Sequence, residues 1–320
     1  MPVLVANHGV STLFTFPGQG AQRAGMLHDL PHDSLVREAL DEASDTLGLD
    51  VLDLDSEAAL RSTVATQLCL LVAGVAMARH LIVQAGPPDA VAGFSVGAYP
   101  AAVTASVLSY RDALLAVDSR ARLMAAAYPS GFGMVAILGL EESALQALIA
   151  QVHTPQRPVY LANINAPTQL VIAGAEPALA RVAELSRERG AHGTKTVAIS
   201  VPSHCELLAE PAARLARAMS TVPVSAPRLR YYSASHAREL REPRRIADDL
   251  ASNMATPVHW HETTLLAGER GARLIVEMPS GNVLTKLADV ALPDALVVAA
   301  ADTRADTIVA LMAREAQRDR

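Results

Sequence analysis

The chain has 320 residues, of which 51% are hydrophobic and 19% are charged. This length and balance predict a globular protein built as one large domain or a domain carrying an insertion, and they exclude a disordered or fibrous chain. The formal net charge is −6 and the sequence has no basic cluster, so we expect no binding to nucleic acid.

The N-terminal segment indicates a cytoplasmic protein. It has no positive charge before Arg23 and no small-residue cleavage site after an apolar run, so we expect no signal peptide. Residues 66–86 form the most apolar long segment, but two glutamines, an arginine and a histidine interrupt it, which favours a buried helix over a membrane span. Cys69 and Cys205 are far apart in the sequence, and in a reducing compartment we expect no disulfide between them.

The first elements in chain order predict a strand, a tight turn and a helix around Ser95. Residues 11–16 are a β-prone run that ends in Pro-Gly-Gln-Gly. Residues 89–95 are a second apolar run, and residues 96–108 have helical length, with Pro100 in the first turn or so, where a missing N–H costs little.

Residues 131–200 predict a unit of their own. Strand-like and helix-like segments follow one another as β-α-β-β-α-β, the split βαβ order of ferredoxin-like units. Further helices are expected at 205–220 and 243–254, and further strands near 228–233, at 273–278 and at 295–300. The predicted fold is therefore α/β, with an α/β-hydrolase-like core formed by residues 1–130 and 201–320 and an inserted ferredoxin-like small subdomain formed by residues 131–200.

Ser95 is the candidate nucleophile, because "GFSVG" places it between Gly93 and Gly97 in the pattern G-x-S-x-G. The pattern alone arises often by chance in a chain rich in alanine and glycine, but the strand and helix around it are the context that a nucleophile elbow requires. A serine hydroxyl also needs a base within hydrogen-bond reach and donors for the oxyanion that forms on attack.

His204 in "SVPSHCELL" is the candidate base, because it lies where the inserted unit returns to the core, and clefts form at such boundaries. Taken alone, it fits an ordinary loop histidine better. "HWHE" at 259–262 suggests a metal at first sight, but histidines at i and i+2 do not share a helix face, and we interpret them as surface residues. Cys205 fits a small buried hydrophobic residue better than a catalytic thiol.

Arg120 lies within a helical segment that is mostly apolar. A guanidinium can hold a carboxylate through two parallel hydrogen bonds, whereas spacing alone favours a solvated helix face.

Together these segments resemble the malonyl-CoA:acyl carrier protein transacylase family. Six blocks match in order along almost the whole chain, and the match replaces the ordinary interpretations of Ser95, His204 and Arg120. The blocks are "FTFPGQGAQ" (14–22), "GFSVGAY" (93–99), Arg120 with Met124, "NINAPTQLVIAG" (163–174), "VPSHCELL" (201–208) and "NMATPVHW" (253–260).

The resemblance implies a ping-pong reaction in which Ser95 takes malonyl from malonyl-CoA and passes it to the thiol of a carrier protein. It implies His204 as base and then acid, the backbone N–H groups of Gln19 and Val96 as oxyanion hole, and Arg120 as partner of the malonyl carboxylate. A main-chain carbonyl near Asn253 would orient the imidazole. The implied pocket also contains Phe94, Met124, Asn165 and Asn253, with no metal and no bound cofactor.

Three departures from the family pattern stand out: Phe94 replaces a histidine, Asn253 replaces a glutamine, and "EMPSGNVLT" (277–285) replaces a Gly-Pro-Gly loop. Phe94 changes a wall of the pocket but leaves the Ser95 hydroxyl and the elbow glycines in place. We expect the changes at 94 and 253 to be energetically coupled.

"NMATPVHWHETT" and "LIVEMPSGNVLT" look most like the epsilon subunit of malonate decarboxylase, whose carrier subunit bears a phosphoribosyl-dephospho-CoA arm in place of phosphopantetheine. That system's other subunits would then be partners as well. Malonyl transacylases of fatty acid or polyketide synthesis are the alternative. An acyl-thioester hydrolase, which would pass the acyl group to water, is the alternative of another class, and a catalytically silent carrier-docking protein is a third.

Overall fold

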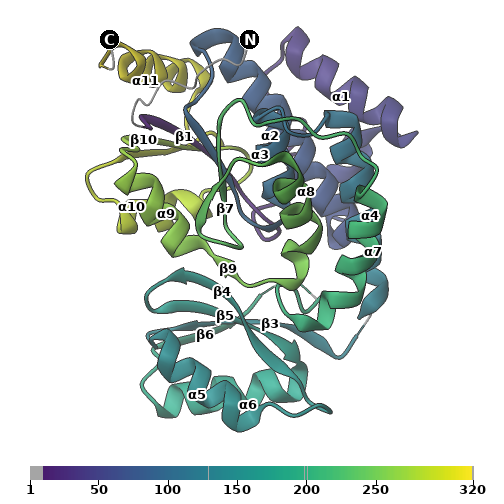
Figure 1. Ribbon diagram of the computed structural model, residues 1–320, viewed down its shortest axis with the longest axis vertical. Helices are drawn as coiled ribbons and strands as arrows, with labels where there is room; N and C mark the ends of the chain where they lie inside the picture. The colour runs from purple at the N-terminus through teal and green to yellow at the C-terminus, as the bar shows by residue number, and fades with distance from the viewer. Residues whose placement is uncertain (1–9, 129, 198, 200, 319–320) are drawn as a thin grey trace.

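The computed structural model describes residues 10–128, 130–197, 199 and 201–318. A six-stranded sheet runs through the larger part of the molecule in the order β11-β10-β1-β2-β7-β8 (Figure 1). Every adjacent pair is parallel except β7 with β8. The strands are β1 (Thr12–Phe16), β2 (Ala90–Gly93), β7 (Arg230–Ser233), β8 (Arg238–Leu240), β10 (Leu274–Glu277) and β11 (Leu296–Ala299).

Helices cover both faces of this sheet, so β1, β2 and β10 are buried on both sides. One apolar core joins the sheet to α1 (Ser34–Leu47), α2 (Thr63–Ala85), α3 (Ala98–Thr104), α4 (Tyr110–Ala127), α7 (Ala209–Met219), α8 (Pro243–Ser252) and α11 (Ala305–Arg318). A second core lies under α9 (Trp260–Glu269) and α10 (Val283–Ala291). The 3-10 helices are η1 (Val51–Asp55), η2 (Ala59–Arg61), η3 (Ser95–Gly97), η4 (Glu206–Leu208) and η5 (Asn253–Ala255).

Helix α2 contains most of the apolar segment singled out in the sequence. It is long and apolar enough to cross a membrane, but 72% of its most apolar window is buried inside the protein. It packs against α1, α3, α4 and α11, which explains why it is apolar on all sides. This is the buried helix that the sequence predicts.

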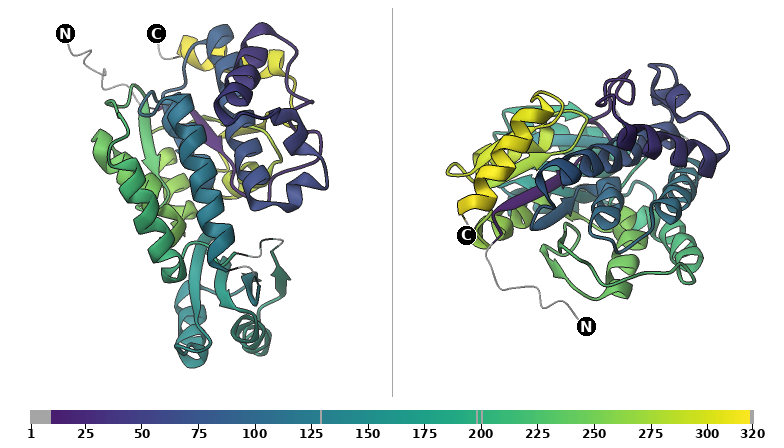
Figure 2. Two further views of the ribbon diagram at one scale, coloured as in Figure 1. Left: turned by 90° about the vertical axis from the view of Figure 1, so that its right-hand side faces the viewer. Right: turned by 90° about the horizontal axis from the view of Figure 1, so that it is seen from above.

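The second sheet has the order β6-β3-β5-β4-β9 and lies at the opposite end of the molecule from the beginning and the end of the described chain (Figure 1; Figure 2, left). Its elements are β3 (Phe132–Leu138), α5 (Glu142–Val152), β4 (Val159–Ala166), β5 (Gln169–Ala175), α6 (Glu176–Glu188) and β6 (Gly193–Thr196). Helices α5 and α6 pack on one face of the sheet around a core of their own. The other face meets Cys205 and so points to the larger part of the molecule.

The predicted β-α-β-β-α-β order and the mixed α/β class are therefore confirmed, with differences at several ends. The helix expected at 96–108 divides into η3 and α3 and ends at Thr104, before Ser106 takes a positive φ of 62°. The last strand expected within residues 131–200 is β6, which ends at Thr196; residues 198 and 200 lie outside the described part. The predictions above did not include α1, α9, α10, α11, β8 or β9. Strand β9 (Val258–His259) belongs to the larger part of the chain but pairs with β4 of the small sheet.

Candidate active site

Ser95 is the first residue of η3, at the sharp turn that follows β2, and it has a positive φ of 56°. Two glycines allow the turn. A Cβ on Gly93 would lie 2.2 Å from main-chain atoms of Gly97 and Ala98, and one on Gly97 would lie 2.1 Å from the carbonyl oxygen of Phe16. The sequence pattern therefore encodes a close approach of three backbone segments, and Ser95 is held in a conformation that non-glycine residues rarely adopt.

His204 approaches Ser95 from a loop 109 residues further along the chain. Its Nε2 lies 2.8 Å from Ser95 Oγ, and its Nδ1 lies 2.8 Å from the carbonyl oxygen of Asn253 and 3.2 Å from that of Thr256. A carbonyl oxygen can only accept, so Nδ1 carries the proton and Nε2 is free to accept from the serine hydroxyl. The His204 N–H donates to the carbonyl oxygen of Met254 at 2.7 Å, which fixes the loop itself.

The environment of His204 keeps the imidazole neutral. Burial, followed by the positive charge of Arg120, lowers its pKa from 6.5 to about 4, against the opposing hydrogen bonds to Asn253 and Thr256. At neutral pH the ring is therefore ready to accept a proton.

Arg120 extends from α4 into the same site and is fully buried. Its Nη1 donates to Gln67 Oε1 at 2.6 Å, and its Nη2 donates to Asn253 Oδ1 at 3.1 Å and to Ser95 Oγ at 3.3 Å. Burial lowers its pKa to about 10, so it remains charged at neutral pH. No carboxylate among the described residues pairs with it, and its Nε has no hydrogen-bond partner. A buried cation with only neutral partners is ready for an anion from outside the protein.

Gln67 is a site residue that the sequence reasoning missed. It lies on α2, 1% exposed, where its Oε1 accepts from Arg120 and its Nε2 donates to Met124 Sδ at 3.5 Å. The sequence carried a signal for it, because Gln67 is a polar residue near the start of the longest apolar segment, and a buried amide needs hydrogen-bond partners.

The two departures at 94 and 253 have different surroundings. The Asn253 amide donates to the carbonyl oxygen of Ser95 at 3.2 Å and accepts from Arg120. The Phe94 ring packs edge-on against Trp260, with ring centroids 5.4 Å apart, and a Cβ on Gly18 would lie 2.9 Å from it. The Asn253 side chain is thus hydrogen-bonded to Arg120 and to Ser95. Ser95, the next residue after Phe94 in the chain, is one connection between the two positions.

A cavity of about 400 Å³ opens beside Ser95 between the two sheets. Its walls include Gln19, Phe94, Met124, Asn165 and His204, so the structure brings these predicted residues to one cavity. Val96 is in the first turn of η3, where leading N–H groups lack intrahelical partners.

The remaining candidates do not form a second centre. Cys205 is 3% exposed, and burial raises its thiol pKa to about 12, which fits the structural role expected for it. His259 and Glu262 are partly exposed and 4.0 Å apart. Within the described ranges, no three His, Cys, Asp or Glu residues are placed to hold a metal ion.

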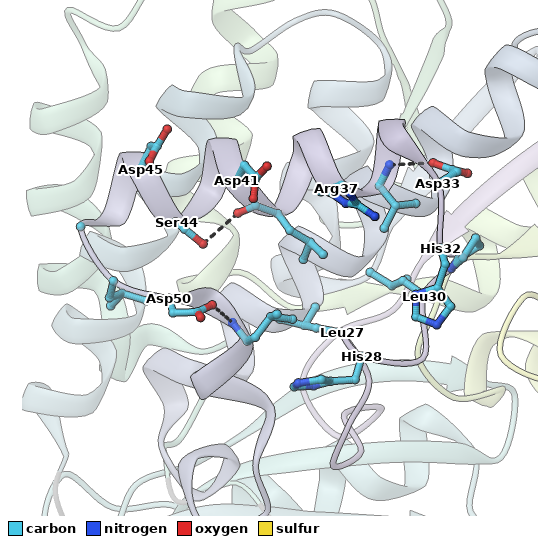
Figure 3. Close-up of a pocket in the computed structure, with 16 residues that line it drawn as sticks. Leu27, His28, Leu30, His32, Asp33, Arg37, Asp41, Ser44, Asp45 and Asp50 are labelled. Atoms are coloured by element: carbon cyan, nitrogen blue, oxygen red, sulfur yellow. Dashed lines mark hydrogen bonds between the residues drawn. The ribbon is translucent and has the colours of Figure 1, made fainter.

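A larger groove of about 720 Å³ lies along α1 and shares no wall residue with the Ser95 cavity (Figure 3). Asp33 and Asp50 line it, but each caps a helix by accepting a main-chain N–H. Because it shares no wall residue with the cavity beside Ser95, this groove is separate from the candidate nucleophile.

Ser95 and His204 are arranged as in serine enzymes that transfer or hydrolyse acyl groups, and residues 13–319 match the acyl transferase domain family, which assigns the chain to the acyltransferases. A Haemophilus influenzae protein named malonyl CoA-acyl carrier protein transacylase is 36% identical over 280 residues, which are 85% of this chain and 89% of that one. The Escherichia coli protein of the same name is 34% identical over 285 residues, 86% of this chain and 90% of its own. The chain belongs to the malonyl-CoA:acyl carrier protein transacylase family.

Solved structures agree with this assignment. That of the Coxiella burnetii malonyl CoA-acyl carrier protein transacylase has a TM-score of 0.90 at 30% identity and covers 96% of this chain and 98% of its own. A malonyl-transacylase in complex with a type II PKS acyl-carrier protein has a TM-score of 0.89 at 31% identity, covering 93% and 98%.

Proposed function

We propose that this protein transfers malonyl from malonyl-CoA to the thiol of an acyl carrier protein through a malonyl-serine intermediate at Ser95. One observation carries the choice of acyl group: the buried, unpaired guanidinium of Arg120 lies 3.3 Å from the nucleophile. An acyl group that ends in a carboxylate supplies the missing anion. Because Arg120 lies so near Ser95, only a short chain can separate that carboxylate from the carbonyl carbon that Ser95 attacks.

In the first half-reaction, Ser95 Oγ attacks the thioester carbonyl while His204 Nε2 accepts the hydroxyl proton. The C–O bond forms, the C–S bond breaks, and the proton passes from Nε2 to the departing CoA sulfur. The carbonyl oxygen of Asn253 stabilises the imidazolium through Nδ1–H. We assign the N–H groups of Gln19 and Val96 to the oxyanion. In the second half-reaction, the carrier thiol gives its proton to His204 Nε2 and its sulfur attacks the carbonyl carbon of the malonyl-serine ester. The new C–S bond forms, the C–O bond to Ser95 breaks, and the proton passes from Nε2 to Ser95 Oγ.

Intact-mass spectrometry after exposure to malonyl-CoA tests the proposal. The expected result is a stable malonyl adduct on Ser95 that disappears when a carrier thiol is added. Rapid turnover to free malonate without a carrier would favour the acyl-thioester hydrolase, and a failure to form any adduct would contradict both.

We further propose that the acceptor is the carrier subunit of malonate decarboxylase, and that the other subunits of that enzyme are partners of this protein in the cytoplasm. The support is the sequence of residues 253–264 and 274–285. Faster transfer to a carrier with a phosphoribosyl-dephospho-CoA arm than to one with phosphopantetheine is expected, and the opposite preference would favour fatty acid or polyketide synthesis.

We also propose that the fold divides into an α/β-hydrolase-like core, residues 1–130 and 201–320, and a ferredoxin-like small subdomain, residues 131–200. The two separate sheets support this division. Limited proteolysis should cut first near its boundaries.

A further inference from the structure

A β-turn from Gly18 to Ala21 lies beside the cavity of the candidate active site. The Ala21 N–H donates to the Gly18 carbonyl oxygen at 3.3 Å, and Gly20 has a φ of 109°. A positive φ at the third position is typical of a type II turn and favours glycine there. The Gly20 N–H donates to Gln22 Oε1 at 2.6 Å. The Gln19 N–H, by contrast, donates to no acceptor in the described ranges of the chain, so it is available to a ligand.

One end of this turn rests on the nucleophile elbow. A Cβ on Gly18 would lie 2.8 Å from the carbonyl oxygen of Phe94 and 3.2 Å from Ser95 Cβ, so the main chain of Gly18 is in direct contact with the elbow. This contact places the next N–H, that of Gln19, near the nucleophile. A contact at one end does not fix the orientation of the turn, which needs a second anchor at its other end.

Ser280 supplies an anchor at that other end. Its side chain is fully buried, and its Oγ donates to the carbonyl oxygen of Ala21 at 2.7 Å. Among the described residues, no other donor reaches this carbonyl oxygen. Met26 Sδ also lies near the hydroxyl, at 3.6 Å, but a thioether is the weaker acceptor. A Cβ on Gly281 would lie 3.2 Å from the Ala21 carbonyl oxygen, so the two loops are in close contact.

The loop that carries Ser280 is itself held at both ends. At its start, the Met278 N–H donates to the Thr15 carbonyl oxygen at 2.8 Å. Across it, the buried Glu277 carboxylate accepts from the N–H of Thr285 at 2.6 Å and from its hydroxyl at 2.7 Å. This segment is one of the three departures from the family pattern, and a Gly-Pro-Gly loop has no side-chain donor. The hydroxyl of Ser280 therefore adds a contact that such a loop cannot make.

We propose that Ser280 is a positioning residue for acyl transfer: through Ala21 it holds the turn so that the Gln19 N–H donates to the oxyanion. The negative charge develops on the carbonyl oxygen when Ser95 attacks and is absent from the bound thioester. The N–H, and with it Ser280, therefore contributes to the rate of acylation more than to the binding of the substrate. The inference rests on the proposed function and gives a role to the loop that distinguishes this chain from the family pattern.

Ser280→Ala removes the hydroxyl and leaves the Ala21 carbonyl oxygen without a donor. Single-turnover acylation of Ser95 by malonyl-CoA is followed by intact mass. Its maximal rate constant should fall about tenfold, less than the roughly 100- to 1,000-fold cost of losing an oxyanion donor outright. The half-saturating concentration of malonyl-CoA should stay within about twofold of that of the wild type. Ser186→Ala is the matched control, because Ser186 is equally buried, its hydroxyl has no hydrogen-bond partner, and it does not line the cavity.

Gln19→Pro tests whether Ser280 acts through the Gln19 N–H. Proline suits the second position of a type II turn and has no N–H, so this variant deletes the donor while it keeps the turn. In the Gln19→Pro background, Ser280→Ala should lower the rate constant by less than about twofold, because the group that Ser280 positions is gone. Gln19→Ala removes the side chain but keeps the N–H, so in that background Ser280→Ala should again cost about tenfold.

Three results would overturn the inference: an unchanged rate constant in Ser280→Ala, a loss that appears in the half-saturating concentration instead, or a loss of about tenfold that persists in the Gln19→Pro background. Ser280→Cys, which keeps a weaker donor, provides the same comparison if Ser280→Ala does not fold. If the proposed function fails instead, the wild type forms no malonyl adduct, a result distinct from all three.

Discussion

Replacing Arg120 by methionine should change which acyl group the enzyme accepts. Methionine has a similar length and fills the buried site without a charge. It removes the donor to Gln67 and Asn253 as well as the one near Ser95, so circular dichroism and urea unfolding first have to show that Arg120→Met is folded.

A hydrogen bond to a charged group contributes about 1.5–3 kcal/mol, which corresponds to roughly a 10- to 150-fold change in an equilibrium or rate constant. We therefore expect Arg120→Met to lower kcat/KM for malonyl-CoA by that factor. Acetyl-CoA has no carboxylate, and its kcat/KM should be unchanged or higher, since the desolvated cation no longer faces an apolar methyl group.

The pH dependence gives a second measurement. The charge of Arg120 lowers the pKa of His204, so its removal should raise that pKa. The acid limb of kcat/KM for acetyl-CoA should then move to higher pH, because a protonated imidazole cannot act as a base. Arg122→Met is the matched control on the same helix, since Arg122 is bound to Asp118 at the surface.

Equal losses of kcat/KM for malonyl-CoA and acetyl-CoA would refute the assignment of Arg120 to the carboxylate. An acid limb that does not move would refute the electrostatic link between Arg120 and His204.

Further predictions concern Ser95, His204 and Phe94. Ser95→Ala and Ser95→Gly should both abolish the malonyl adduct in mass spectra. The free energy of unfolding in urea should be about 1 kcal/mol higher for Ser95→Gly than for Ser95→Ala, because glycine adopts the positive φ without strain. Equal free energies of unfolding would argue against backbone strain at this position. His204→Ala should lose acyl transfer but keep malonyl-CoA binding. The folded-state pKa of His204 is about 4, below its unfolded value of 6.5, so the unfolded state binds more protons between these values. The wild type should therefore lose about 3 kcal/mol of stability as pH falls through that window, and His204→Ala should lose that much less. The double variant Phe94→His with Asn253→Gln should transfer malonyl faster than the effects of the two single changes together predict, because Phe94 precedes Ser95 in the chain and the Asn253 amide is hydrogen-bonded to Ser95. A coupling energy of zero in the double-mutant cycle would show that the two positions are independent.

The sequence determined the elements whose signals are local. The turn at Ser95 follows from Gly93 and Gly97, because main-chain atoms approach so closely there that no side chain fits. The split βαβ unit follows from alternating strand and helix patterns within one stretch of chain. Short elements such as β9 were missed, because two residues carry no periodic pattern and pair only with a strand some 95 residues away.

The tertiary structure decided the arrangement around the nucleophile. Arg120 could have been a solvated helix residue, and its burial depends on Gln67 and Asn253, which lie 53 and 133 residues from it in the sequence. The orientation of His204 depends on the carbonyl oxygen of Asn253, a main-chain group present at every residue and therefore without a sequence signal. Sheet register aligns Lys195 on β6 with Asn163 on β4 across the two strands between them, and register is set by packing and pairing of the whole sheet.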